Sequence, residues 1–160
     1  MAKEWIEKLA EDIKTKEHKP AEEFAKEQRR LEALNRKGRL FYDELFKTLA
    51  SDIAELNLAL SGDVTGSTIT IGPVPSAHNV NFNITRPNFP KVTAAIRYSR
   101  DNIVFAYTQQ NGVQMSVQYT FHVGENEGVS VKEAFGESAK HFNHPAELAK
   151  HIMELLFRPA

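Results

Sequence analysis

Two histidines and a glutamate near the C-terminus have the spacing of residues that share one face of a helix. His144, Glu147 and His151 stand at i, i+3 and i+7, and side chains three or four residues apart are neighbours on a helix. Imidazole and carboxylate groups bind zinc, so the three residues are a candidate metal site. Their order is not that of the HExxH motif, and the chain has no cysteine to complete a structural site. A helix cap and surface histidines explain the same residues, and we expect no cofactor.

A second set of polar residues follows one side of a stretch in which apolar and polar side chains alternate. From Val113 to Val123 every second residue is apolar, and this period of two predicts a strand with one buried and one solvated face. A face rich in amides can hydrogen-bond a ligand or an extended peptide, although every one-sided antiparallel sheet has a solvated face. The candidate ligand-binding residues are Asn81, Asn83, Arg97, Gln114, Gln118 and His122.

No motif for covalent or phosphate chemistry accompanies these residues. There is no cysteine nucleophile and no G-x-S-x-G elbow. The segment from Gly62 to Ser67 is not a Walker loop, because it lacks the GK[ST] ending. Asp63 is explained as a turn residue between a helix and a strand. We therefore assign no catalytic residue and expect that the protein is not an enzyme.

One basic cluster lies between residues 29 and 39. With phosphate it would form a salt-sensitive patch, so nucleic-acid binding is one alternative function. Interleaved Glu27 and Glu32 reduce the field of the cluster, and the whole chain has 20 Lys and Arg against 21 Asp and Glu. A helix with both signs of charge is typically solvated or paired with another helix, which favours a protein partner over nucleic acid. The cluster consists of Arg29, Arg30, Arg36, Lys37 and Arg39.

The first 38 residues are nearly all helix formers and carry much of the charge of the chain. The spacing of Trp5, Ile6, Leu9 and Ile13 predicts a short amphipathic helix from about Ala2 to Lys14. Proline disfavours helical geometry at the residue before it and suits the first position of a helix. The sequence therefore predicts a break after residue 14 and a second helix that begins at Pro20. The apolar residues of this second helix, which form a candidate partner interface, are Phe24, Leu31 and Leu34.

Residues 40–61 have the strongest helical pattern in the chain, with a wide apolar band typical of a helix packed on a sheet. Gly62 is at a plausible C′ position. Gly38 leaves two alternatives open, because a lone glycine either ends a helix or only weakens it by about 1 kcal/mol. If the helix continues through Gly38, its first half extends past the sheet, and the exposed apolar residues of that half need a partner.

The residues from Val64 onward are rich in β-branched and aromatic types, punctuated by glycine, proline and asparagine. Asn111-Gly112 predicts a type I′ turn that joins two strands in a hairpin. Short links join the other strands in sequence, as in an antiparallel meander. The predicted strands are Ser67 to Gly72, His78 to Thr85, Val92 to Ser99, Asn102 to Gln109, Val113 to Val123 and Gly128 to Val131.

These elements predict one α+β domain over residues 1–160. An antiparallel meander of five to six strands (67–131) is covered on one face by a long N-terminal helical segment and a C-terminal helix (144–157). The N-terminal segment divides into a charged helical arm (1–38) and a core helix (40–61). His144-Pro145-Ala146-Glu147 opens the C-terminal helix, with proline at its first position.

Composition places the chain among ordinary globular proteins, with 41% hydrophobic and 26% charged residues. The N-terminus is unlike a signal peptide, no apolar run approaches the ~20 residues that span a bilayer, and we expect a cytoplasmic protein with no membrane contact. We predict a non-enzymatic interaction or adaptor domain that binds a protein partner or self-associates through its N-terminal helices. The alternatives are a small-molecule-binding domain, with or without catalysis, that uses the polar sheet face, and nucleic-acid binding through residues 29–39.

Overall fold

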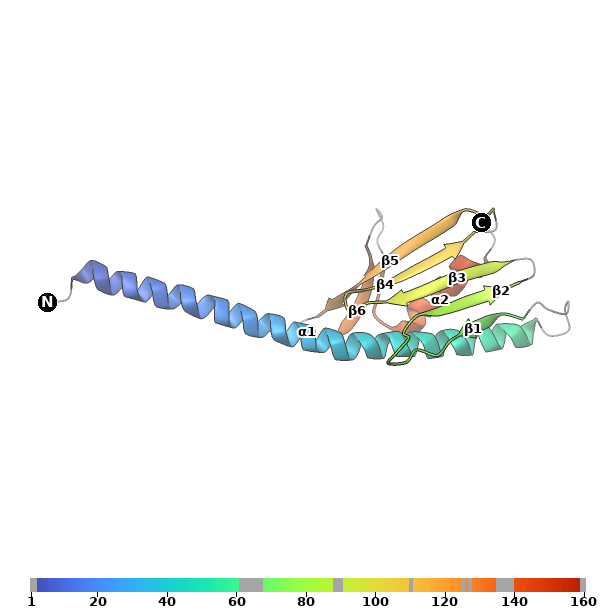
Figure 1. Ribbon diagram of the computed structural model, residues 1–160, viewed down its shortest axis with the longest axis horizontal. Helices are drawn as coiled ribbons and strands as arrows, with labels where there is room; N and C mark the ends of the chain where they lie inside the picture. The colour runs from blue at the N-terminus through green and yellow to red at the C-terminus, as the bar shows by residue number, and fades with distance from the viewer. Residues whose placement is uncertain are drawn as a thin grey trace.

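The structure is a computed structural model and describes residues 3–60, 68–87, 91–109, 111–124, 126, 128–134 and 140–158, without the side chains of residues 17–19. A long helix, α1 (Glu4–Ala59), is followed by seven strands and a second helix, α2 (Pro145–Phe157). Figure 1 shows that α1 extends far past the sheet at its N-terminal end. The predicted α+β class and antiparallel sheet are confirmed. The predicted helix end at Ser61-Gly62-Asp63 and the strand start at Ser67 lie outside the described residues.

Helix α1 is continuous over 56 residues, which corresponds to about 84 Å at 1.5 Å per residue. The predicted break between residues 14 and 20 is wrong, because Pro20 lies inside the helix. Proline has a helical φ angle, and it removes one hydrogen bond to the carbonyl four residues earlier. Pro20 is exposed, so water can satisfy that carbonyl.

Gly38 does not interrupt α1 either, so the continuous alternative is the one that the structure shows. The helix presses onto the sheet at this position. A Cβ atom on Gly38 would lie 3.8 Å from Leu34 Cδ1, from Phe121 Cε1 and from the Tyr98 hydroxyl oxygen. These are ordinary contact distances, so the glycine is not required by the available space.

The seven strands form one antiparallel sheet in sequence order from β1 to β7. The sheet has seven strands rather than five to six, because the sequence does not signal the two-residue strand β7, which pairs with β6. The predicted strand from His78 begins later, since Ser76 and Asn79 form a turn in which Ser76 N donates to Asn79 O. The strands are β1 (Thr70–Gly72), β2 (Phe82–Arg86), β3 (Val92–Tyr98), β4 (Asn102–Thr108), β5 (Gln114–Val123), β6 (Val129–Glu133) and β7 (His141–Phe142).

The predicted hairpin between β4 and β5 is present, with a different turn. Tyr107 pairs with Met115 in the ladder, and Gln109 N donates to Val113 O at 2.8 Å. Three residues, 110–112, therefore connect the strands, where a type I′ turn would use two. Gly112 has a φ of 85°, the left-handed conformation that three-residue hairpin loops require.

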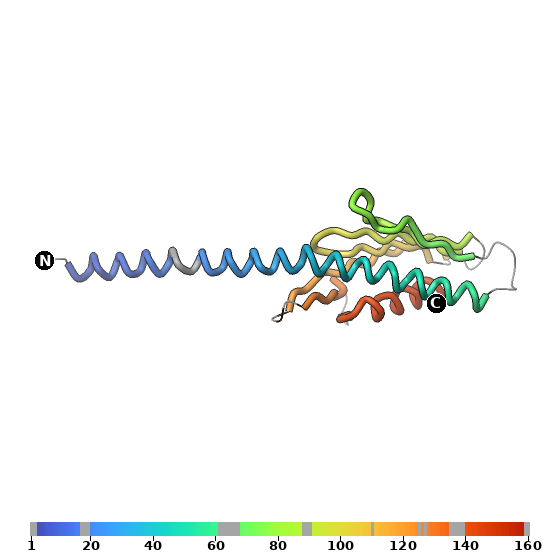
Figure 2. Tube along the Cα trace, turned by 90° about the horizontal axis from the view of Figure 1, so that it is seen from below, coloured from blue at the N-terminus to red at the C-terminus, as the bar shows by residue number. Residues whose placement is uncertain are grey.

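One face of the sheet is covered by both helices, and the opposite face is open (Figure 2). The covered face contains buried side chains from every strand between β2 and β7, including Phe82, Phe105 and Tyr119. Val113 and Met115 belong to the apolar side of their strand but are exposed. The expectation that they are buried is wrong, because the helices do not cover this end of β5.

Two side chains of α1 also hold the sheet through polar contacts. The Tyr42 hydroxyl donates to Val80 O at 2.6 Å. The amide of Asn57 donates to Ile69 O and accepts from Ile69 N, both at 2.9 Å, as a neighbouring strand would. The C-terminal half of α1 is therefore fixed in register against the β1–β2 edge of the sheet.

Within the described residues, no helix is both long and apolar enough to cross a membrane.

Candidate functional site

Helix α1 has a free N-terminal part, called here the arm and defined as residues 4–30. Among the described residues, no large apolar side chain is buried before Leu34, which is 1% exposed, and Ala33 beside it is also buried. Figures 1 and 2 show that the arm extends beyond the sheet and beyond α2. Five large apolar residues of the arm are exposed, and they are Trp5 (61%), Ile6 (47%), Leu9 (53%), Ile13 (51%) and Phe24 (66%).

The tip of the arm repeats the spacing of the part of α1 that packs on the sheet. Thirty-six residues separate Leu9 from Leu45, which is ten full turns at 3.6 residues per turn. The same interval separates each of the other three apolar tip residues from a buried residue. The four pairs are Trp5 and Phe41, Ile6 and Tyr42, Leu9 and Leu45, and Ile13 and Leu49.

The two quartets therefore lie on the same face of one helix. The quartet of residues 41–49 is buried against the sheet, and the quartet of residues 5–13, called here the tip quartet, is in solvent. An amphipathic helix gains most of its stability by burying its apolar face. The tip quartet therefore has the spacing of residues that pack against another element, but its side chains are exposed.

The predicted partner interface of Phe24, Leu31 and Leu34 requires correction. Leu34 belongs to the core and Leu31 is half-buried, so only Phe24 is available to a partner. The misplacement follows from the predicted boundary near Gly38, whereas the body of the protein already covers α1 from Leu31 onward.

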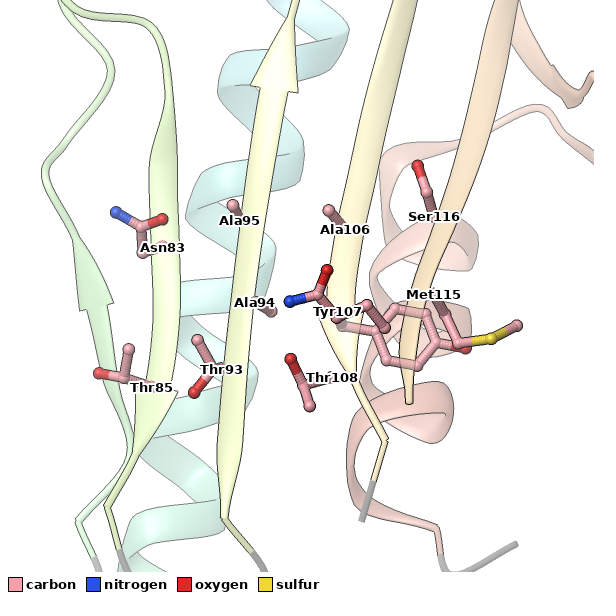
Figure 3. A pocket seen from close by; sticks show the side chains of 11 residues that line it. Asn83, Thr85, Thr93, Ala94, Ala95, Ala106, Tyr107, Thr108, Met115 and Ser116 are labelled. Atoms are coloured by element: carbon pink, nitrogen blue, oxygen red, sulfur yellow. The ribbon is translucent and has the colours of Figure 1, made fainter. Parts of the chain in front are cut away.

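The open face of the sheet is the second surface. A depression lined by uncharged residues crosses it from β2 to β5 (Figure 3). Ala95 and Ala106 are paired across β3 and β4, and their small side chains form the floor. Asn83 and Ser116 stand at the two ends of the same cross-strand row. We call this depression, of about 540 Å³, the alanine trough.

A second row of polar residues lies beside the floor of the alanine trough. Among the described residues, the trough side chains that form no hydrogen bond are those of Asn83, Thr93, Thr108, Gln114 and Ser116, while Thr85 bonds to Thr70 across the β1–β2 edge. Unpaired amides and hydroxyls above a flat floor can bind an uncharged polar molecule.

The structure brings together only part of the predicted ligand-binding set. Asn83 and Gln114 line the alanine trough. Arg97 and Gln118 lie one row away, on either side of Val104. Asn81 precedes β2, and its Oδ1 accepts a hydrogen bond from Tyr98 N. His122 lines a separate hollow at the other edge of the sheet.

The proposed metal ligands do not come together. His144 caps α2 and is exposed, while the Glu147 Oε2 atom accepts a hydrogen bond from Asn143 N. His151 faces the sheet, and its Nε2 atom lies 3.2 Å from Glu133 Oε1. In the described part of the chain, no group of three or more His, Asp or Glu residues is arranged to hold a metal ion.

The contact between His151 and Glu133 belongs to a buried polar cluster that the sequence does not reveal. Glu133 is on the covered face because it pairs with Tyr119 across β5 and β6. Burial lowers the pKa of His151, with a contribution from Lys140, while the Glu133 carboxylate opposes this shift. Burial also raises the pKa of Tyr119, whose hydroxyl has no hydrogen-bond partner among the described residues. The predicted strand from Gly128 to Val131 ends two residues before Glu133. A prediction that extended this strand to Glu133 would have placed its side chain on the covered face.

The basic cluster is partly neutralised by neighbours on α1. Arg30 forms a bidentate pair with Glu27, at 3.0 and 3.2 Å. Arg39 bonds to Asp43 at 2.9 Å and lies over the Tyr98 ring. Such pairing reduces the positive field that nucleic-acid binding requires.

Comparison of the chain with protein-family models, with curated proteins and with solved structures gives no match. The residues and their geometry therefore carry the functional inference.

Proposed function

We propose that the protein is a non-enzymatic interaction domain that self-associates through the tip quartet of its arm. The observation that supports this is the ten-turn repeat, because four exposed apolar residues reproduce the spacing of four residues that the sheet buries. Burial of a large apolar side chain contributes about 1.5–3 kcal/mol. Burying the four exposed side chains of the tip quartet in an interface would therefore favour association of the arm with a partner.

The arm also needs a partner for its own stability. Isolated helices shorter than about 12–15 residues are marginal in water, and packing supplies most of the stability of longer ones. The ion pairs of exposed helices, such as Arg30 with Glu27, contribute only about 0.2–0.5 kcal/mol each. A second copy of the chain, paired antiparallel over residues 4–30, offers the exposed Phe24 of its arm to the tip quartet.

The charge distribution along α1 favours an antiparallel pair of arms. Residues 3–28 carry six basic and eight acidic side chains, whereas residues 29–39 carry five basic and one acidic. A parallel pair would place the two basic clusters together. An antiparallel pair that overlaps residues 4–30 keeps the two basic clusters at opposite ends and places the N-terminal end of each arm beside Arg29 and Arg30 of the other.

Sedimentation velocity on the full chain tests the proposal. We expect a dimer for the unchanged protein and a monomer for the double variant Leu9→Ser and Ile13→Ser, with both proteins folded. Leu40→Ser is the matched control, because Leu40 is on the same helix and similarly exposed (57%) but lies outside the arm. A monomer for the unchanged protein, or a dimer that survives the double change, would refute self-association through the tip.

The direction of pairing has its own measurement. The chain has no cysteine, so Glu4→Cys introduces a single site for a spin label. In an antiparallel pair with full overlap of residues 4–30, the two labels lie about 40 Å apart along the helix axis. A short distance between the labels would indicate a parallel pair.

Small-molecule binding in the alanine trough is a second candidate function, favoured by the unpaired amides and hydroxyls around the alanine floor. A thermal-shift screen of uncharged metabolites tests it, because a ligand at 100 times its Kd adds about 2.7 kcal/mol to stability. Ala95→Leu would fill the trough and abolish the response to any hit. A response that persists in this variant would place the ligand elsewhere.

A further inference from the structure

The opposite edge of the open face contains a second hollow, formed by β5, β6, β7 and the loop after β5. Its volume is about 760 Å³. His122 pairs with Ser130, and Lys132 pairs with His141, so these four side chains lie on the same face of three adjacent strands. The strand register therefore brings together residues that the sequence separates by up to nineteen positions.

The polar atoms of the hollow converge. His141 Nε2 lies 2.7 Å from the Ser130 hydroxyl oxygen, which fixes the orientation of both side chains. The rings of His122 and His141 have centroids 6.4 Å apart, with an interplanar angle of 71°. A small ion between the two rings would be near both imidazoles and the Ser130 hydroxyl, and Lys132 lines the same hollow.

Among the described residues, the charged and titratable side chains that line this hollow are all basic. They are His122, Lys132 and His141. The strand positions on the open face include no Asp or Glu, because Glu133 faces the helices. Glu147 of α2 approaches the rim at Asn143, where its carboxylate is held by a backbone N–H. This basic character contrasts with the net charge of -1 for the chain.

We propose that His122, Ser130, Lys132 and His141 bind the phosphate group of a small phosphomonoester. A tetrahedral oxyanion accepts hydrogen bonds from several directions, and charge-assisted bonds from ammonium and imidazolium groups are the strong ones. A phosphomonoester carries a charge of about −1.5 to −2 near neutral pH.

Titration of the full chain with inorganic phosphate and with sulfate, followed by NMR of the histidine side chains, tests this site. We expect both anions to bind saturably and to perturb His122 and His141. His122→Ala, His141→Ala and Lys132→Ala should each weaken binding at least fivefold. His78→Ala is the matched control, because His78 is exposed and outside the hollow.

Three results would overturn the proposal. One is the absence of saturable binding of either anion, and another is binding that is indifferent to the three substitutions. The third concerns Glu125 and Glu127, which lie outside the described residues. Replacing both with glutamine should preserve or strengthen phosphate binding. If the unchanged protein binds Zn²⁺ but no anion, and these two changes abolish zinc binding, the site is a cation site.

Discussion

The two halves of α1 share the spacing of their apolar residues but differ in whether those residues are buried. Leu45 and Leu49 are buried against the sheet, while Leu9 and Ile13, ten turns earlier on the same face, are in solvent. Amphipathic spacing therefore specifies which face of a helix is apolar, and it leaves open what covers that face. In the C-terminal half the cover is the sheet of the same chain. In the arm we propose that it is a second copy.

The largest expected effect is a difference in stability between substitutions in the two halves of α1. Leu45→Ala removes a buried side chain from the core and should lower the free energy of unfolding by about 2–5 kcal/mol. Leu9 lies on the same face of α1, ten turns earlier. Leu9→Ala should change the free energy of unfolding of the monomer by less than about 0.5 kcal/mol, because the side chain is exposed. Urea denaturation at low protein concentration measures both. Similar losses for the two variants would mean that the arm packs on its own domain.

Two tyrosines of the core should respond with opposite signs. The Tyr42 hydroxyl donates to Val80 O, so Tyr42→Phe should cost about 0.5–1.5 kcal/mol. The Tyr119 hydroxyl is buried without a partner in the described structure, and an unpaired buried polar group costs about 1–3 kcal/mol. Tyr119→Phe should therefore be neutral or stabilising in the same denaturation experiment. A clear loss of stability would show that its hydroxyl has a partner.

A smaller effect is expected at Gly38, where the covered part of α1 begins. Glycine inside a helix costs about 0.5–1 kcal/mol relative to alanine. The space for a Cβ atom is present, with its nearest neighbours at 3.8 Å. Gly38→Ala should raise the midpoint of thermal unfolding. A decrease would mean that the helix and the sheet approach each other more closely at Tyr98 and Phe121.

The smallest expected effect is a pH dependence confined to the covered half of the molecule. Burial lowers the pKa of His151 in the folded protein, so the unfolded chain binds a proton first as the pH falls. The free energy of unfolding therefore decreases as the pH falls below about 6.5, the ordinary pKa of histidine. His151→Gln should remove this part of the pH dependence. An unchanged profile would assign it to other groups.

The parts of the fold that follow from local pattern could be predicted from the sequence. The alternation from Val113 to Val123 and the wide apolar band after Gly38 were sufficient for the sheet, its open face and the helical cover. The covering helix fails to reach Met115, and no local pattern encodes that limit. Pro20 is a second case in which the local sequence was not sufficient. A break was expected before it, but its φ angle is compatible with a helix and α1 continues through it.

The candidate sites were less predictable, because they depend on strand register. His122 was recognised as a polar residue of the open face, but its neighbours Ser130 and His141 come from strands whose pairing the sequence does not specify. His151 was assigned to a metal site on the surface of α2, whereas the helix turns it toward Glu133. The repeat between the tip and the core of α1 is visible in the printed sequence once the helix is known to be continuous.

Hydrogen–deuterium exchange of the arm as a function of protein concentration tests the central claim most directly. If a second copy covers the tip quartet, the amides of residues 4–14 should be protected at high concentration and should exchange rapidly on dilution. The double variant Leu9→Ser and Ile13→Ser should show rapid exchange at every concentration. Equal protection of the unchanged arm at all concentrations, or no protection at any, would contradict the account.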